Sequence, residues 1–299
     1  MREYLHVAER IIGTPLMLMP SKAQTIASVV LARQGSDVIV ETSADLAPSP
    51  RSGPLQEQRM VANDRLPFLL DPESGIAVIE VAGSLAHRQG YIGAASGVMG
   101  YDGIAAAFEA AVAQPEVRAI LLDLHSPGGE VAGAFQLADR IAAARGSKPL
   151  IALADELAAS AAYLIAAACD EIALASEVAQ VGSVGVVTVH VSYEEMLRNE
   201  GIRPTVITAG ARKADGNPYQ DLPEDVRDRI QAGVDGVMDQ FVGRIATWRG
   251  LSGRAVRDTQ AAMFMGRAAV EAGLADGIAD PLTLFDALAA EIRPALCVA

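Results

Sequence analysis

From Gly75 onward, short apolar runs of the kind that form buried strands alternate with longer segments whose apolar residues recur at helical spacing. The strand-like runs include "GIAVIEVAG", "VRAILLDLHS", "PLIALAD" and "EIALA", and helical patterns such as "EVAGAFQLADRIAAAR" separate them. Parallel strands need crossover connections, which are usually helices. The alternation therefore predicts an α/β fold with a largely parallel sheet and flanking helices.

The same reading predicts strands over residues 184–192 and 203–210, a helix through "YEEMLRNEG" and a long amphipathic helix over 223–250. An apolar stripe on that long helix is expected to pack against the core, with a neighbouring subunit as the alternative. We expect four segments in all: a helical leader over 1–36, a polar linker over 37–73, one folded domain over 74–290 and a tail over 291–299.

Composition excludes several classes of function. The net charge of −13 and the lack of a basic stripe argue against nucleic acid as the main ligand. The apolar stretches fall short of the roughly 20 residues of a membrane-spanning helix, and the N-terminus does not read as a secretory signal. Cys169 and Cys297 form neither a disulfide framework nor a metal motif, and Cys169 is expected to pack as a small hydrophobe. We therefore expect a cytoplasmic protein.

The stretch "LHSPGGEV", from Leu124 to Val131, places paired glycines where a buried strand ends. Gly128 and Gly129 would let the backbone expose its N–H groups, and a following helix N-terminus would favour negative charge. That arrangement suits an oxyanion hole. A turn that needs glycine only for its shape is an equal alternative.

Ser160 stands in "ELAASAAYLIAAACDEIALA", at the start of an apolar helix and with alanines on both sides. The small neighbours leave the hydroxyl uncovered, as an attacking serine requires. Taken alone, a serine in this position is more often just a helix N-cap.

A serine nucleophile needs a base. Three of the four histidines, His87, His125 and His190, suit ordinary core or rim positions, and His6 lies in the leader. The chain has only three lysines: Lys22, Lys148 and Lys213.

Lys213 is the suggestive one, because it would follow the predicted strand 203–210 at the edge of a parallel sheet where active sites gather. Ser183, between two glycines in "VGSVGVV", is a candidate to orient a lysine amine. A solvated loop lysine and a turn-capping serine are the alternatives.

Five motifs occur in one order along the chain: "SPGGEV", "AASAAYLIAAACDEIALA", "VGSVGVV", "AGARKADGNPYQDLPEDV" and "GRAAVEAGLADGIAD". Together they resemble the protease IV / signal peptide peptidase A family of serine–lysine proteases. The stretch "RKADGNPY" is similar to the lysine-bearing motif of the phage branch, the capsid assembly proteases. The resemblance covers about residues 74–285.

The resemblance implies a ClpP/crotonase-like fold with Ser160 as nucleophile and Lys213 as general base. Ser183 would hold the lysine, and the backbone N–H groups of Gly129, Ala161 and Gly128 would supply the oxyanion hole. The amine must be neutral to accept a proton, which a desolvated position favours. No cofactor or metal is implied. Arg212 stands where many members carry tyrosine, and it places a positive charge beside Lys213.

The expected role is an endopeptidase that processes scaffold, capsid or portal proteins in a host cytoplasm or procapsid, as a homo-oligomeric ring. Cleavage within the chain's own stretch 37–73 would accompany it. The alternatives are a signal-peptide-degrading peptidase, a crotonase-like acyl-CoA enzyme and an inactive structural homologue. A serine–histidine–aspartate triad that uses His190 is the rival mechanism.

Overall fold

The computed structural model describes residues 14–19, 66–88 and 97–292. The chain divides into two compact units. The core unit comprises the described residues of Met17–Met19, 66–88, 97–185 and 241–292. The lysine unit comprises residues 14–16 and Val186–Gln240. Each unit is described by itself.

The core unit is built on two sheets. The larger sheet has eight strands, in the order β11-β10-β8-β6-β3-β2, with β9 beside β8 and β12 beside β9. Its strands are β2 (Leu69–Leu70), β3 (Ile76–Ala82), β6 (Ala119–Ser126), β8 (Leu150–Ala159), β9 (Glu171–Leu174), β10 (Gln180–Gly182), β11 (Met263–Met265) and β12 (Gly277–Ile278). The pairings among β3, β6, β8, β9, β10 and β12 are parallel, and β2 and β11 join antiparallel. The predicted α/β class with a largely parallel sheet is confirmed.

A second, four-stranded sheet has the order β1-β7-β4-β5. Its strands are β1 (Leu16–Leu18), β4 (Ser84–Ala86), β5 (Val98–Gly100) and β7 (Gly128–Glu130). It connects directly to the larger sheet, because β4 follows β3 and β7 follows β6 after short turns. Its strand β7 lies next to the residues on either side of Ser160, which itself follows β8 of the larger sheet.

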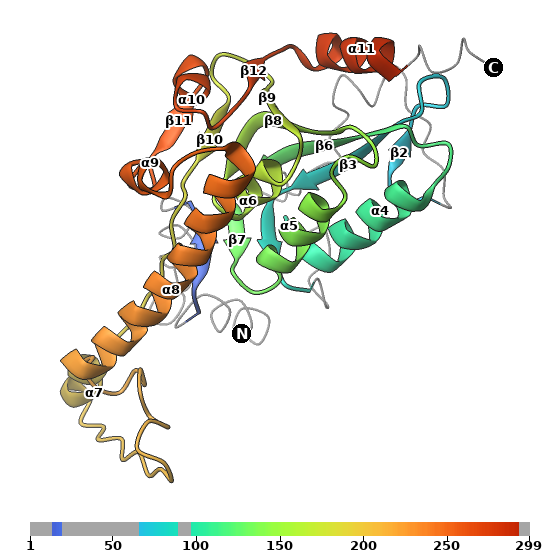
Figure 1. Cartoon of the computed structure of the whole chain (residues 1–299). Helices are drawn as coiled ribbons and strands as arrows, with labels where there is room; N and C mark the ends of the chain where they lie inside the picture. Colours follow the sequence, from blue (N-terminus) through green and yellow to red (C-terminus); the bar gives the residue numbers. More distant parts are fainter. Residues whose placement is uncertain (1–13, 20–65, 89–96, 293–299) are drawn as a thin grey trace. The chain divides into compact units, whose positions relative to one another are not determined.

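The helices of the core unit cover the larger sheet. They are α4 (Tyr101–Ala113), α5 (Ala134–Ala143), α6 (Ala161–Ala167), α9 (Gly253–Asp258), α10 (Arg267–Glu271) and α11 (Pro281–Ile292). Figure 1 shows α4 and α5 side by side next to the sheet. On α11, Phe285 and Leu288 are buried in one cluster with sheet residues such as Ile76, Leu121 and Leu153. Residues on β3 and β6 are almost all buried, as expected for parallel strands covered on both faces.

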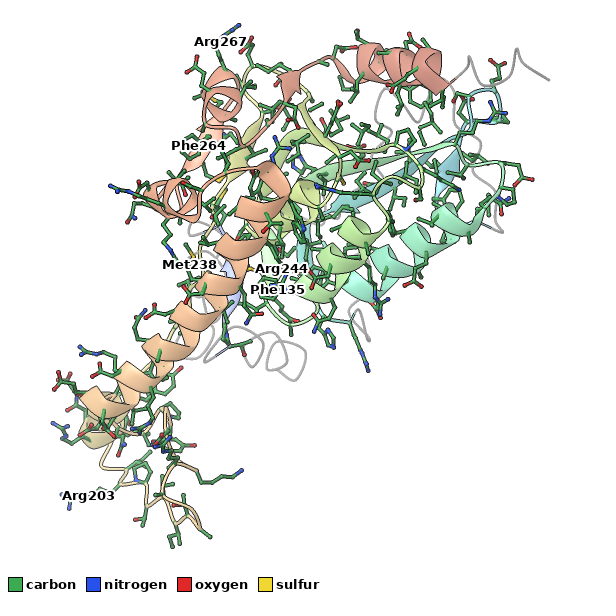
Figure 2. The ribbon with its side chains drawn as sticks, in the orientation of Figure 1. Phe135, Arg203, Met238, Arg244, Phe264 and Arg267 are labelled. Atoms are coloured by element: carbon green, nitrogen blue, oxygen red, sulfur yellow. The ribbon has the colours of Figure 1, made fainter. Side chains whose placement is uncertain are left out.

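A long helix, α8 (Glu224–Arg249), confirms the prediction for 223–250. Its last part belongs to the core unit, where Phe241, Val242 and Ile245 are buried. There Arg244 forms an ion pair with Asp139 at 2.7 Å, and its guanidinium lies 4.6 Å from the centre of the Phe135 ring. Figure 2 labels Arg244 and Phe135 beside each other. The predicted packing of the stripe against the core is therefore observed for the C-terminal part of the helix.

The lysine unit contains the first part of α8 and the short helix α7 (Glu194–Asn199). The predicted strand over 203–210 is wrong: these residues form no regular strand, and all eight are exposed. The prediction for 184–192 is also wrong as a continuous strand, since only single bridges form there. One of them joins Val187 to Leu16. A β-branched run makes a strand only where a partner strand is available.

The predicted leader, linker and tail fall largely outside the described residues. Where the leader is described, Leu16–Leu18 is a strand, whereas we expected helix. Cys169 is fully buried as predicted, and burial raises the pKa of its thiol to about 12. Among the helices that the structure describes, none has the length and apolar character needed to cross a bilayer.

Candidate active site

Ser160 lies on a sharp turn between the end of β8 at Ala159 and the start of α6 at Ala161. Its backbone has φ 56° and ψ −115°, and residues other than glycine rarely adopt a positive φ of this kind. Two hydrogen bonds hold it there: its N–H donates to Gly182 O at 2.8 Å, and its carbonyl accepts from Leu164 N at 2.9 Å. Strained strand-to-helix turns of this kind present the nucleophilic serine in α/β-hydrolases.

The Ser160 side chain does not have the role of an ordinary capping serine. Its hydroxyl makes no cap hydrogen bond to α6. The Oγ atom is buried, and it has no hydrogen-bond partner among the residues that the structure describes. An unsatisfied buried hydroxyl costs about 1–3 kcal/mol, so its presence calls for an explanation. The geometry excludes the N-cap alternative and leaves a hydroxyl that is available for chemistry.

The paired glycines form a strand, β7, and not the start of a helix. The expectation of a helix N-terminus at this point is wrong, because α5 begins only at Ala134, after Gly133. Gly128 has φ 96°, and a Cβ added to it would lie 2.9 Å from Ala159 O and 3.0 Å from Ala161 N. Only glycine therefore permits this close approach of the strand to the two residues that flank Ser160.

Ser126 organises the glycine strand, and the sequence analysis missed it. Its fully buried hydroxyl donates to Gly83 O at 2.6 Å and accepts from Gly128 N at 3.1 Å. The Gly128 amide is therefore already engaged by a side chain. The signal was available in "HSPGG", where a serine stands two residues before the first glycine, a spacing at which hydroxyls often bond the backbone.

Gly129 and Ala161 are the other two predicted donors. Ala161 is the first residue of α6, so its N–H has no acceptor within the helix. Gly129 pairs with Leu85 of β4, and a Cβ at Gly129 would lie 1.8 Å from Leu85 O. Strand β7 thus sits tightly between β4 and the Ser160 turn.

Ser183 lies beside the same turn. It is buried, has φ 54° and donates its N–H to Ala262 O at 2.9 Å. The preceding residue, Gly182, accepts the Ser160 N–H. The structure therefore brings together Ser160, Ala161, Gly128 and the backbone of Ser183 within the core unit.

Lys213 belongs to the lysine unit. It lies in a run of turns over residues 211–216, where its N–H donates to Gly210 O at 3.1 Å, and its side chain is exposed. The argument that Lys213 follows a strand is wrong, because 203–210 forms none. The expected desolvation is likewise not seen in the single chain.

The remaining candidate bases have structural contacts. Nδ1 of His125 donates to Asp155 O at 2.6 Å, beside an irregularity in the pairing of β6 with β8. Nε2 of His190 lies 3.2 Å from Asn217 O, within the lysine unit. The Lys148 amine donates to two carbonyls near the end of α4, at 2.8 and 2.9 Å, and burial lowers its pKa. Lys148 thus caps a helix. Among the described residues, no group of three potential metal ligands occurs.

The chain's sequence relatives identify the family to which it belongs. Residues 142–292 match peptidase family S49, and this match covers half of the chain, so the chain belongs to that family. Membership confirms the resemblance to the protease IV / signal peptide peptidase A proteases.

Two phage proteins are among its relatives. The chain is 38% identical over 277 residues to the head-tail preconnector protein GP5 of Enterobacteria phage P21, which covers 92% of this chain and 55% of that protein. It is 37% identical over 284 residues to the capsid assembly protease C of Escherichia phage lambda, which covers 92% and 63%. The chain thus spans between half and two thirds of the length of these relatives.

A solved structure, the 1510-N membrane-bound stomatin-specific protease, is similar with a TM-score of 0.40 and 17% identity, over 71% of this chain and 82% of that one.

Proposed function

We propose that the chain is a serine endopeptidase in which Ser160 is the nucleophile and Lys213 the general base. The observation that carries the proposal is the Ser160 hydroxyl: buried, unpartnered among the described residues, and held on a strained turn beside a glycine strand. Membership of peptidase family S49 supports the same reaction.

In the proposed mechanism, the neutral Lys213 amine removes the Ser160 proton as Oγ attacks the scissile carbonyl. The backbone N–H groups of Gly129 and Ala161 stabilise the oxyanion, and Ser183 orients the lysine. The protonated amine then gives its proton to the leaving amine. Water hydrolyses the acyl-enzyme with the lysine again acting as base.

Gly128 positions strand β7 and is not an oxyanion donor in this proposal, because its N–H donates a hydrogen bond to the Ser126 hydroxyl. Its missing side chain lets β7 approach the residues on either side of Ser160.

We further propose that the peptidase works as a homo-oligomer. Five large apolar residues of the lysine unit are exposed in the single chain: Met196, Ile202, Val206, Ile207 and Tyr219. Apolar side chains gathered on one segment are typical of an interaction surface. A neighbouring copy that covered this segment would also exclude water from Lys213, as a lysine base requires.

The proposed substrates are capsid, scaffold or portal proteins of a phage, cleaved in the host cytoplasm during head assembly. The names of the two phage relatives support this role. A signal-peptide-degrading role remains the alternative within the same family. An acyl-CoA enzyme would not need a serine–lysine pair.

The test is turnover of the cognate scaffold protein by wild type and five single variants. We expect Ser160→Ala and Lys213→Ala each to lower kcat at least about a thousandfold. Lys213→Arg should fail equally, because arginine keeps the charge but cannot act as a base at neutral pH. Ser147→Ala, at an exposed serine, is the control and should leave kcat unchanged.

Normal turnover by Lys213→Ala would rule out the dyad, and loss of activity in His190→Ala alone would favour the triad. Mixing the Ser160→Ala and Lys213→Ala proteins adds a second measurement. Activity regained in the mixture would show that the serine and the lysine of one site come from two copies of the chain.

A further inference from the structure

Strand β1 runs along the glycine strand. It lies next to β7 in the four-stranded sheet, and Met19 N donates to Pro127 O at 2.9 Å. Its side chains are buried, with Leu16 3% exposed, Met17 fully buried and Leu18 5% exposed. A segment far away in sequence, "TPLMLM", is thus paired with the backbone at the candidate active site.

The contact reaches the residues that flank the nucleophile. A Cβ built on Gly128 would lie 2.2 Å from Met17 O and 3.0 Å from Ala161 N. The Met17 carbonyl oxygen and the Ala161 nitrogen therefore both lie beside Gly128. The Ala161 N–H is one of the two donors proposed for the oxyanion hole, so β1 passes close to a proposed catalytic donor.

A peptide substrate needs the same edge. Extended peptides commonly bind enzymes and receptors by adding a strand to a sheet edge, with main-chain hydrogen bonds giving affinity and side-chain pockets giving specificity. Here β1 takes that edge of β7. Ser160, the residue that a substrate must reach, has no exposed surface.

We propose that the segment Leu16–Met19 is an internal substrate mimic that occupies the peptide-binding edge of β7. The peptidase is closed in this state, and it opens when an extended peptide of similar chemistry displaces β1. We accordingly expect the favoured substrate segment to carry apolar side chains that are either unbranched, as in Met, or branched at Cγ, as in Leu. This inference rests on the proposed peptidase function.

The first test weakens β1 through its backbone. Met19→Pro removes the N–H that donates to Pro127 O, whereas Met19→Ala shortens the side chain and keeps that N–H. We expect Met19→Pro to raise the rate at which a fluorophosphonate probe labels Ser160 by about tenfold, as the loss of one backbone hydrogen bond would allow. Met19→Ala should label at close to the wild-type rate. A folded Met19→Pro protein that is labelled no faster than wild type would overturn the inference.

A second test avoids destabilising substitutions. In Ser160→Ala, which cannot cleave, hydrogen exchange of residues 14–19 is followed by mass spectrometry with and without an excess of the synthetic peptide Thr-Pro-Leu-Met-Leu-Met-Pro. We expect exchange of the chain's own Leu16–Met19 amides to become at least about fivefold faster when the peptide binds, because displacement frees them. A scrambled peptide of the same composition is the control. Bound peptide with unchanged protection at these amides would show that β1 is a permanent strand of the core.

Different results would overturn the peptidase function and the substrate-mimic role of β1. If wild type cleaves and Ser160→Ala does not, the peptidase function stands whatever β1 does. Fast labelling of wild type, equal to that of Met19→Pro, would remove only the substrate mimic. Equal inactivity of wild type, Met19→Pro and Ser160→Ala on every substrate would remove the peptidase function itself.

Discussion

The core unit and the lysine unit differ in how completely each buries its own apolar residues. In the core unit, strands β3, β6 and β8 are covered on both faces, and the Ser160 turn is fixed by backbone hydrogen bonds within the unit. In the lysine unit, five of the seven exposed large apolar residues of the described chain gather on residues 186–240. The proposed nucleophile, Ser160, thus stands in a unit that buries most of its apolar residues, and the proposed base, Lys213, stands in a unit that leaves several of them exposed.

This difference indicates which half of the proposed dyad would depend on assembly. The strained backbone at Ser160 persists only because many neighbouring contacts hold it in place, and those contacts all belong to the core unit. An exposed lysine is a poor base, and the lysine unit needs further burial to change that. We therefore expect perturbations of the core unit to act on folding, and perturbations of the lysine unit to act on assembly and turnover.

Apart from the Ile245→Asp control described below, the largest effect is expected from Gly129→Ala. The new Cβ would lie 1.8 Å from Leu85 O, a backbone atom, so β7 could not keep its place beside β4. We expect the free energy of unfolding to fall by at least about 3 kcal/mol, with loss of peptidase activity, measured by urea titration and scaffold cleavage. Gly103→Ala is the control: nothing lies within 4 Å of its added Cβ, and an exposed helical alanine should stabilise by up to about 1 kcal/mol. A Gly129→Ala protein of wild-type stability would contradict the tight packing of β7.

Helix α8 offers a comparison within one element. Arg249, in the core unit, has a side chain that is only 6% exposed and is paired with Asp276 at 2.7 Å. Arg227, in the lysine unit, is 62% exposed and is paired with Asp228 at 3.0 Å. We expect Arg249→Ala to lower the free energy of unfolding by about 2–3 kcal/mol, because it removes a nearly buried guanidinium together with its ion pair to Asp276 and its hydrogen bond to Gly273 O. Arg227→Ala should change it by less than about 0.5 kcal/mol. Equal losses from the two variants, in the same urea titration, would refute the contrast between the units.

Much of the core unit was predictable from the sequence because its signals are local. Apolar runs marked β3, β6 and β9, and the paired glycines of "SPGG" marked a close backbone approach. The same glycines were assigned to a helix start, and they form β7 instead, because the pairing of β7 with β4 and β1 is set by residues far away in the chain. Local pattern cannot report such pairings.

Because a local pattern does not report pairing with distant residues, strand β1 was missed and a strand over residues 203–210 was wrongly predicted. "TPLMLMP" has no strand signal that distinguishes it from the rest of the leader, which we predicted to be helical, and β1 forms because β7 offers an edge. Conversely, Val206 and Ile207 sit in a run typical of a strand, and no strand forms there. Ser160 was identifiable by its small neighbours, but its backbone strain and its unpartnered hydroxyl are visible only in three dimensions.

We expect Ile207→Asp to have the smallest effect on the free energy of unfolding. The same substitution should have the largest effect on oligomer formation. Ile207 is 90% exposed, so a charge there leaves no cavity and stays in solvent in the single chain. We expect the free energy of unfolding, measured at concentrations where both proteins are monomeric, to change by less than about 0.5 kcal/mol. Light scattering at higher concentration should show a loss of oligomer, because a carboxylate in an apolar contact is costly to desolvate.

Ile245→Asp is the matched control for this last comparison. Ile245 is fully buried on the part of α8 that belongs to the core unit, so the same change should cost more than about 4 kcal/mol and abolish folding before assembly can be judged. If Ile207→Asp unfolds as readily as Ile245→Asp, residues 203–210 pack inside their own chain. If its oligomer persists with full activity, copies of the chain meet elsewhere, and Lys213 must be desolvated by the substrate itself.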